Sequence, residues 1–325
     1  MSTMTMGKAL NSGLRTVLDN DPKTILMGQD IGKLGGVFRI TDGLQKDFGS
    51  ARVVDAPLGE AGIIGTAIGL ALRGFRPVCE IQFDGFVFPA FDQITTMLAK
   101  MHYRSAGKLR LPITIRIPYG GGIGAVEHHS ESPESYFIHT AGLKVVTPST
   151  PADAFAMIQQ SVTSDDPIIF LEPKRRYWDK GEIVEDSNDW SALHSARVVR
   201  EGTDATVAAY GPMVKTSLQA ADAAASEGRN VEVIDLRTLA PLDLEPVFTS
   251  VRKTGRLIVV HEAPMTLGLG AEISARVTQE CFYSLEAPVL RVTGFDTPYP
   301  AARVEETYLP DLDRVLDAVD RSFDY

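Results

Sequence analysis

The feature that most constrains this chain is a regular alternation of short β-branched runs with longer helical stretches. In the first half, the runs that predict strands are Thr24–Met27, Arg52–Asp55, Val78–Gln82, Ile113–Ile117, Lys144–Thr147 and Ile168–Leu171. The stretches that predict helices between them are Lys8–Asn20, Gly59–Leu72, Pro89–Tyr103 and Pro151–Ser164. This alternation is typical of a parallel sheet that is covered by helices on both faces.

A second alternation follows a polar stretch over residues 174–195. That stretch has no sustained apolar period, and its acidic residues are Asp179, Glu182, Glu185, Asp186 and Asp189. Beyond it, the predicted strands are Ala205–Ala209, Val231–Ile234, Leu257–His261 and Val289–Thr293, and the predicted helices are Met213–Glu227, Glu245–Arg252, Gly268–Phe282 and Leu312–Arg321. A chain of 325 residues has room for two domains. We predict two α/β domains, residues 1–180 and 197–325, joined by a linker over 181–196.

Charge, hydropathy and cysteine content narrow the functional classes. A formal charge of −10 argues against nucleic-acid binding, which requires a basic surface. No run approaches the roughly 20 apolar residues that cross a bilayer, and the first ten residues do not resemble a secretory signal. Cys79 and Cys281 lie in apolar surroundings, which is typical of buried free thiols in a reducing compartment. We expect a cytoplasmic protein that binds neither nucleic acid nor a membrane.

A glycine-rich segment after the fourth predicted strand imitates a dinucleotide-binding motif. Gly120, Gly122 and Ala125 give the pattern G-x-G-x-x-A. A true fingerprint opens an apolar helix after the first strand, whereas this segment runs into the polar residues 127–132 and then Pro133. We therefore interpret it as a loop that forms the wall of a site, because glycines allow close approach of the backbone.

Glu60 stands at the start of an otherwise apolar, glycine-rich predicted helix. An acid in the first turn is favoured by the helix dipole, and this structural explanation needs no ligand. The functional explanation is a partly buried acid with a raised pKa that shares a proton with a ligand nitrogen. The residues alone leave both explanations open.

Aromatic and histidine residues follow two other strands. We expect Phe83, Phe88 and Phe91 in the core, whereas Phe86, beside a glycine, can offer its face to a flat heterocycle. His128 and His129 lie in the polar part of the glycine-rich loop, where a site and a structural role are both open. Their spacing gives no zinc set.

Motifs along essentially the whole chain resemble those of one family, the β subunits of the thiamine-diphosphate-dependent component of 2-oxoacid dehydrogenase complexes. The matching segments are Gly35–Arg39, Pro57–Gly65, Glu80–Gln93, Gly120–Ser132, Gly142–Pro151, Asp235–Asp243 and Val260–Pro264. The resemblance implies a pyrimidine-binding domain followed by a domain like the transketolase C-terminal domain.

The resemblance also assigns roles to individual residues. It implies that Glu60 hydrogen-bonds N1′ of the thiamine aminopyrimidine, favouring the imino tautomer that deprotonates the thiazolium carbon. Leu58, Gln82 and Phe86 match positions that line the pyrimidine, with Phe86 against its face. His129 aligns with the histidine of the family's His-Ser-x-Ser motif and is expected to position and protonate groups during decarboxylation or acyl transfer.

The resemblance implies that this chain forms half of a site. It lacks the Gly-Asp-Gly motif that holds the diphosphate through magnesium (Mg²⁺) in such enzymes. A separate α subunit is expected to supply that function in an α₂β₂ heterotetramer. Family members dock the lipoyl acyltransferase core through the C-terminal domain of the β subunit. The acidic residues at the C-terminus would suit docking onto a basic domain of that core. A solvated acidic helix explains these residues equally well.

Two positions depart from the family pattern. Gln29 replaces a glutamate of an acidic tunnel that is proposed to couple the two active sites, which puts that coupling in doubt, although Asp92 remains. The family's potassium (K⁺) loop matches Ile113, Ser161 and Asp166, but Ser164 replaces an aspartate. A monovalent cation at this loop is an expectation of the resemblance.

The substrate is predicted from two segments, Glu80–Gln93 and Gly142–Arg176, which look closest to branched-chain β subunits. We expect oxidative decarboxylation of branched-chain 2-oxoacids and acyl transfer to the lipoyl group, with pyruvate dehydrogenase as the alternative. A self-sufficient transketolase-like enzyme fits less well, because the diphosphate motif is absent. The alternative of another class is a non-catalytic scaffold that docks the acyltransferase core.

Overall fold

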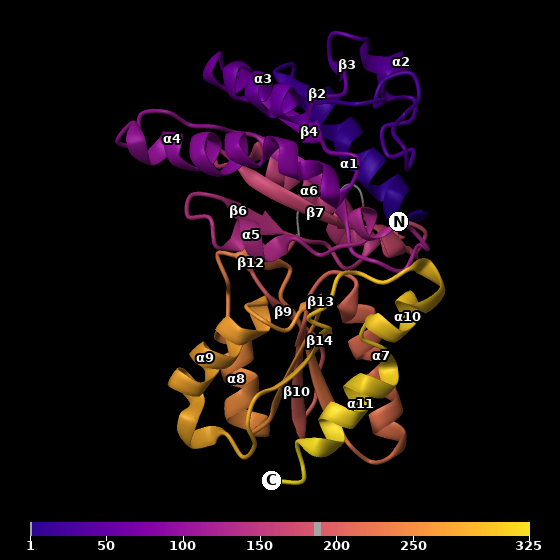
Figure 1. The fold of residues 1–325 in the computed structure, drawn as a ribbon, viewed down its shortest axis with the longest axis vertical. Helices are drawn as coiled ribbons and strands as arrows, with labels where there is room; N and C mark the ends of the chain where they lie inside the picture. Colours follow the sequence, from indigo (N-terminus) through magenta and orange to yellow (C-terminus); the bar gives the residue numbers. More distant parts are fainter. Residues whose placement is uncertain (1, 185–189) are drawn as a thin grey trace. The chain divides into compact units, whose positions relative to one another are not determined.

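The computed structural model describes residues 2–184 and 190–325, and these group into two compact units (Figure 1). The first unit is formed by described residues within 1–119 and 136–193, and the second by described residues within 120–135 and 194–325. The glycine-rich loop therefore groups with the C-terminal part of the chain. Domain boundaries at residues 180 and 197 stay a prediction.

A parallel sheet forms the centre of the first unit. Its strands are β2 (Thr24–Gly28), β3 (Val53–Asp55), β4 (Arg76–Glu80), β5 (Thr114–Tyr119), β6 (Lys144–Val146) and β7 (Ile168–Pro173). They are arranged in the order β6-β7-β5-β4-β2-β3, and each neighbouring pair is parallel. The predicted strands are confirmed with small shifts at their ends. β2 lies between β3 and β4, so the segments that follow these strands meet at one edge of the sheet.

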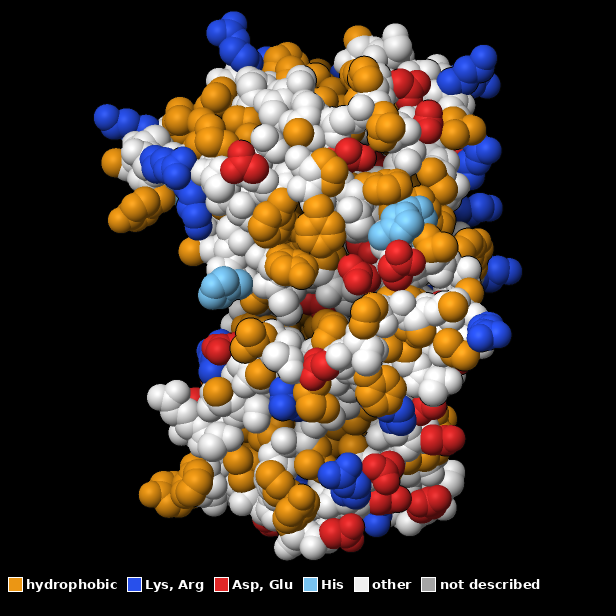
Figure 2. Space-filling model, in the orientation of Figure 1, with side chains coloured by type: hydrophobic (Ala, Val, Ile, Leu, Met, Phe, Trp, Pro, Cys, Tyr) orange, Lys and Arg blue, Asp and Glu red, His pale blue; other side chains and the backbone are white. Residues whose placement is uncertain are grey.

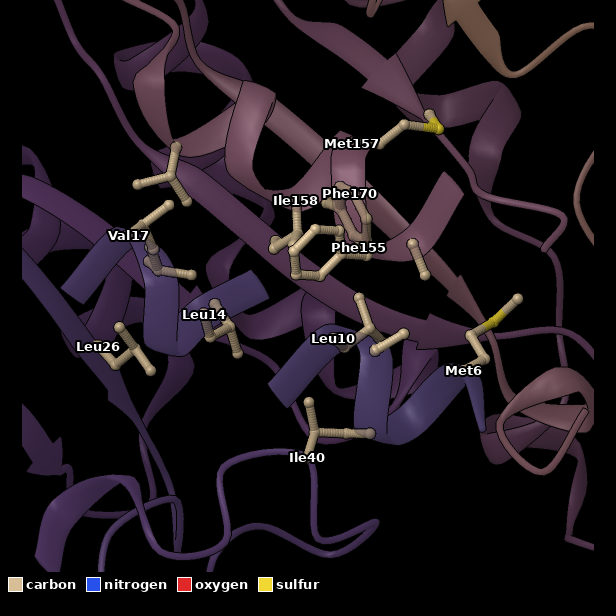
Figure 3. Packing of buried hydrophobic residues seen from close by; sticks show 14 of the residues in the cluster. Met6, Leu10, Leu14, Val17, Leu26, Ile40, Phe155, Met157, Ile158 and Phe170 are labelled. Atoms are coloured by element: carbon tan, nitrogen blue, oxygen red, sulfur yellow. The ribbon is translucent and has the colours of Figure 1, made fainter. Parts of the chain in front are cut away.

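Helices α1 (Met6–Asn20) and α6 (Pro151–Thr163) pack together along the core of the first unit. The buried residues of α1 recur at helical spacing, which gives the helix one apolar face: Met6, Ala9, Leu10, Gly13, Leu14, Val17 and Leu18. Figure 3 shows this face against Phe155 and Ile158 of α6. A Cβ on Gly13 would lie 2.5 Å from Cγ2 of Ile158, so the close approach of the two helices requires glycine.

The other helical segments of the first unit differ from the prediction in two ways: one long predicted helix is broken, and the short segments at residues 44–48, 134–138 and 174–176 were not predicted. The helical segments are α2 (Leu44–Phe48), α3 (Glu60–Leu72), η1 (Asp84–Ala90), η2 (Gln93–Leu98), α4 (Ala99–Arg104) and η4 (Lys174–Arg176), while α5 (Glu134–Ile138) crosses the boundary between the units. A single helix over Pro89–Tyr103 was expected. The segment is instead a 3₁₀ turn that contains Pro89, then a π-helical stretch, then α4. Pro89 has no N–H for an α-helical hydrogen bond, which favours a break here.

The second unit is a smaller α/β sandwich. Its strands are β9 (Arg197–Arg200), β10 (Ala205–Ala209), β11 (Val231–Asp235), β12 (Thr238–Ala240), β13 (Leu257–Pro264) and β14 (Leu290–Gly294). The order β14-β13-β10-β11-β9 is parallel except for the edge strand β9. Helices α7 (Met213–Ser226) and α11 (Leu312–Arg321) pack together, as do α8 (Glu245–Thr254) and α9 (Leu269–Cys281), on the two sides of this sheet. The shorter segments are η3 (Glu127–His129), η5 (Phe282–Ser284), η6 (Ala302–Val304) and α10 (Glu305–Tyr308).

The sequence analysis missed a small antiparallel sheet. β1 (Ser2–Thr5) pairs with β8 (Lys180–Ile183), so part of the predicted linker is a strand. Four residues are too few to show a period, and Lys180 and Glu182 made the segment look like a loop. Glu185, Asp186 and Asp189 of the predicted linker lie outside the described residues.

Cys79 and Cys281 are buried free thiols, as expected, and burial raises the pKa of each. Every helix of the described residues is too short or too polar to span a bilayer.

Candidate functional site

Glu60 is the first residue of α3 and lies at the edge of the sheet in the first unit. Its residue surface is 8% exposed, and its side chain forms no hydrogen bond or ion pair with any other described residue. The following turns are apolar, with Ile63, Ile64 and Ala67 buried. The helix dipole favours an acid in the first turn. The Glu60 oxygens are not among the buried polar atoms without a partner, so the carboxylate is accessible at the edge of the sheet and is bound by no group of the described residues. This geometry fits an acid that is reserved for a ligand.

The other predicted pyrimidine-lining residues lie in the same unit as Glu60. Phe86 belongs to η1, which packs against α3, and its ring meets Phe83 edge-on at 6.0 Å. Gln82 donates from Nε2 to the Gln29 carbonyl oxygen at 3.3 Å. The side chain of Leu58 is 73% exposed. Leu58 and Glu60 follow β3, and Gln82 and Phe86 follow β4. The four residues offer an acid, an aromatic ring, an amide and an apolar side chain, which suits a flat nitrogen heterocycle.

The expected burial of three phenylalanines is wrong in part. Phe88 is 44% exposed, and its ring contacts the ring of Tyr136 at 5.8 Å. Phe83 and Phe91 are half-buried. The break at Pro89 turns this segment away from a regular helix, so its aromatic residues do not share one buried face.

A buried ionic cluster joins the strands that lead to the site, and sequence reasoning missed it. Arg116 of β5 binds Glu80 of β4 at 2.6 Å and Glu172 of β7 at 2.6 Å, and the hydroxyl of Tyr177 donates to Glu172 at 2.6 Å. Burial raises the pKa of Glu80, and the charge of Arg116 opposes that shift. The signal that the sequence offered was a single charged residue, Arg116, inside the otherwise uncharged strand β5. The cluster fixes the end of β4 at Glu80, two residues before Gln82.

Beside this cluster, Lys174 forms a fully buried ion pair with Asp84, at the start of η1. The same ammonium group lies 5.6 Å from the ring centroid of Phe83. These contacts hold the turn that carries Phe86.

His129 belongs to the second unit and ends the 3₁₀ turn η3. It is half-buried, and its backbone N–H donates to the Val126 carbonyl at 3.0 Å. Its ring meets that of His128 edge-on at 4.3 Å. The structure thus gathers Leu58, Glu60, Gln82 and Phe86 in the first unit, while His129 is held by the second.

The glycine-rich loop uses its backbone N–H groups on carboxylates of the chain itself. Gly121 donates to Glu262 at 3.1 Å, and Gly124 donates to Glu305 at 2.7 Å. Such N–H groups would bind the phosphates of a dinucleotide in a Rossmann loop. In this protein the same N–H groups bind carboxylates of the chain itself. The glycines are therefore explained without a bound dinucleotide.

The expected cation loop is mostly engaged by protein donors. The Ile113 carbonyl accepts from the Ile168 N–H, the Ser164 carbonyl accepts from Arg76 at 2.8 Å, and Asp166 pairs with Lys144 at 2.6 Å. Oγ of Ser161 is buried and has no partner among the described residues, which fits a cation ligand. Within residues 2–184 and 190–325, no group of three or more His, Cys, Asp or Glu side chains could hold a metal ion. Potassium stays a prediction.

Comparisons with known proteins match the whole length of the chain. The transketolase pyrimidine-binding domain matches residues 2–179, and the transketolase C-terminal domain matches residues 194–315. A pyruvate dehydrogenase E1 component subunit beta of Leifsonia xyli is 61% identical, covering 100% of this chain and 96% of its own. A 3-methyl-2-oxobutanoate dehydrogenase subunit beta of Mycobacterium tuberculosis is 52% identical, covering 98% and 92%.

A solved structure supports the fold. An inactive β4 tetramer of a split-gene transketolase superposes with a TM-score of 0.80 at 22% identity, covering 99% of this chain and 98% of its own. At that identity the likeness concerns the fold alone. It agrees with the predicted class of two α/β domains, pyrimidine-binding and transketolase C-terminal, which is confirmed.

Proposed function

Because this chain belongs to the β subunits of 2-oxoacid dehydrogenase E1 components, we propose that it supplies the pyrimidine-binding half of a thiamine diphosphate site and acts on pyruvate. Membership makes the chain a subunit of a dehydrogenase enzyme and implies an α subunit as its partner. The cofactor, when bound, supplies an ylid and an electron sink.

The observation that carries the cofactor proposal is the state of Glu60. It is the carboxylate of a largely buried residue at the start of an apolar helix, and it has no protein partner among the described residues. A ligand nitrogen would satisfy it, and the shared proton would be held strongly because the surroundings are apolar. Phe86 would contact the face of the heterocycle, and Leu58 and Gln82 would border it. His129 is proposed to position and protonate reacting groups.

Pyruvate is proposed as the substrate because a pyruvate dehydrogenase subunit is 61% identical to this chain. Branched-chain 2-oxoacids were expected from the sequence, and the 52% identical relative keeps them as the second candidate. The identities favour the alternative over the first expectation. A single methylene in an apolar pocket is worth only about 1–3 kcal/mol of discrimination, so small side-chain differences can exchange the two substrates.

The test is a reconstitution of this chain with its α subunit. Thiamine-dependent release of carbon dioxide would be measured with an artificial electron acceptor, and kcat/KM would be compared for pyruvate and 2-oxoisovalerate. A higher value for pyruvate supports the proposal. A higher value for 2-oxoisovalerate overturns the substrate and leaves the cofactor role unchanged.

The assembly proposed is an α₂β₂ heterotetramer, in which the α subunit holds the diphosphate and Mg²⁺. We further propose that the C-terminal domain docks the acyltransferase core. Acidic side chains gather over α11 (Figure 2), and several are engaged within the chain, because Asp317 pairs with Arg321 and Asp320 with Arg229. If the chain is only a scaffold, replacing Glu60 leaves both assembly and carbon dioxide release unchanged.

A further inference from the structure

Two buried carboxylates of the second unit bind the start of the loop that carries His129. Oε2 of Glu262 accepts from the Gly121 N–H at 3.1 Å. The carboxylate of Glu305 accepts from the Gly122 N–H at 3.1 Å and from the Gly124 N–H at 2.7 Å. Successive peptide N–H groups therefore form a concave donor site, and side chains of β13 and α10 fill it.

Glu305 is engaged entirely with this loop and one hydroxyl. Its residue surface is 6% exposed, and it forms no ion pair among the described residues. Its further partner is the Tyr299 hydroxyl, which donates at 2.9 Å. Burial and the neighbouring Glu305 raise the pKa of Tyr299, so the hydroxyl stays a donor. Loss of the Glu305 charge would leave peptide donors and a hydroxyl poorly satisfied.

The glycines of the loop are required by this arrangement. A Cβ on Gly121 would lie 1.9 Å from the Tyr299 hydroxyl oxygen. Gly122 and Gly124 have φ of +84° and +72°, which side chains rarely adopt. The loop is therefore shaped to present its N–H groups to the carboxylates, and its conformation depends on them.

The loop is also closed at its base. The Gly120 N–H donates to the Glu131 carbonyl at 2.9 Å, on the far side of His129. The short turn η3 lies in the sequence between Gly124 and Glu131. In this turn the His129 N–H donates to the Val126 carbonyl. The backbone of His129 is thus restrained from both sides. On the N-terminal side Glu305 binds Gly122 and Gly124, and on the C-terminal side the Glu131 carbonyl binds Gly120.

We propose that Glu305, supported by Glu262 and Tyr299, is a positioning residue for His129. This inference rests on the proposed function, because it takes His129 as a group that acts on the reaction. It gives the C-terminal domain a part in the chemistry, although none of the site residues predicted from the sequence belongs to residues 194–325.

The test begins with Glu305→Gln in the complex with the α subunit. The amide brings N–H groups toward the peptide donors, so kcat is expected to fall about 10- to 100-fold, as for a misplaced catalytic group, with a smaller change in KM. The matched control is Glu306→Gln, because Glu306 is the exposed neighbour and its side chain forms no hydrogen bond or ion pair among the described residues. It should keep the wild-type kcat.

A double-mutant cycle decides whether Glu305 acts through His129. If it does, adding Glu305→Gln to His129→Ala causes little further loss of kcat. If the two losses multiply, or if Glu305→Gln alone has the wild-type kcat, the proposal is overturned. Failure of the wild-type complex to release carbon dioxide would instead contradict the proposed function.

A second variant covers the case in which Glu305→Gln does not assemble with the α subunit. Tyr299→Phe keeps both carboxylates and removes one donor. It should lower kcat about 3- to 10-fold, and this loss should disappear in the His129→Ala background. A Tyr299→Phe loss that persists in that background overturns the proposal.

Discussion

Glu60 of the first unit and Glu305 of the second are both largely buried residues, yet the protein treats their carboxylates in opposite ways. Glu60 has no partner among the described residues, whereas Glu305 accepts from two glycine N–H groups and one tyrosine hydroxyl. An acid whose oxygens the fold binds contributes to shape, and an acid whose oxygens the fold leaves unbound is available to a ligand. Burial alone would not have separated the two roles.

The largest effect is expected from Glu60→Gln. If Glu60 shares a proton with the cofactor, the amide should reduce carbon dioxide release at least about 100-fold. Stability should hold or rise slightly, because the replaced carboxylate has no protein partner among the described residues. Activity assays and thermal unfolding measure the two quantities on the same sample.

The contrast between Glu60 and Glu305 is lost if Glu60→Gln causes a large loss of stability. Such a loss would mean that the Glu60 carboxylate contributes to folding and is not reserved for a ligand. Glu306→Gln serves again as the control for a carboxylate change with neither effect.

The buried ionic cluster of the first unit provides the second test. Arg116→Met leaves Glu80 and Glu172 buried without their cation, so the free energy of unfolding should fall by about 3–5 kcal/mol. The control is Arg110→Met, which breaks an exposed pair with Asp165 and should cost less than about 1 kcal/mol. Denaturant unfolding measures both, and equal losses would contradict the structural importance of the cluster.

Glu134 of the second unit gives an intermediate case, with one oxygen satisfied and one not. Tyr210 donates to Oε1 at 2.6 Å, and Oε2 has no partner among the described residues. Burial raises the pKa of Glu134 from 4.5 to about 7, against the bond from Tyr210.

Because this pKa is raised in the folded state, Glu134 lowers stability as pH rises from about 4.5 to about 7. Glu134→Gln should remove that loss and stabilise the protein by up to about 3 kcal/mol at alkaline pH, with little effect in acid. Unfolding midpoints at about pH 5 and pH 8 measure the difference. An equal effect at both pH values would contradict the assignment.

The smallest effect concerns the cation loop. If K⁺ binds near Ser161, exchanging K⁺ for Na⁺ should lower stability by about 1 kcal/mol, and Ser161→Ala should reduce that dependence. Identical unfolding midpoints in both salts would show that the hydrogen bonds of Arg76 and Lys144 suffice at this loop.

The sequence predicted the parallel strands β2–β7, β10, β11, β13 and β14 well, because strands buried on both faces are short continuous apolar runs between turn signals. It did not predict the edge strand β9 or the short strand β12. It identified Glu60 and Phe86 as candidates, because each follows a strand at the edge where such folds bind ligands. It could not show that Glu60 lacks a partner or that Glu305 binds Gly122 and Gly124, because the two glycines lie far from Glu305 in the chain. Nor could it find β8, whose pairing with β1 is set by tertiary structure.

The most direct test of the half-site proposal is thiamine-dependent carbon dioxide release by this chain alone, by its α subunit alone, and by the two together. The account predicts release only from the mixture, and its loss when the β chain carries Glu60→Gln. Release from this chain alone, or undiminished release from the Glu60→Gln mixture, would contradict it.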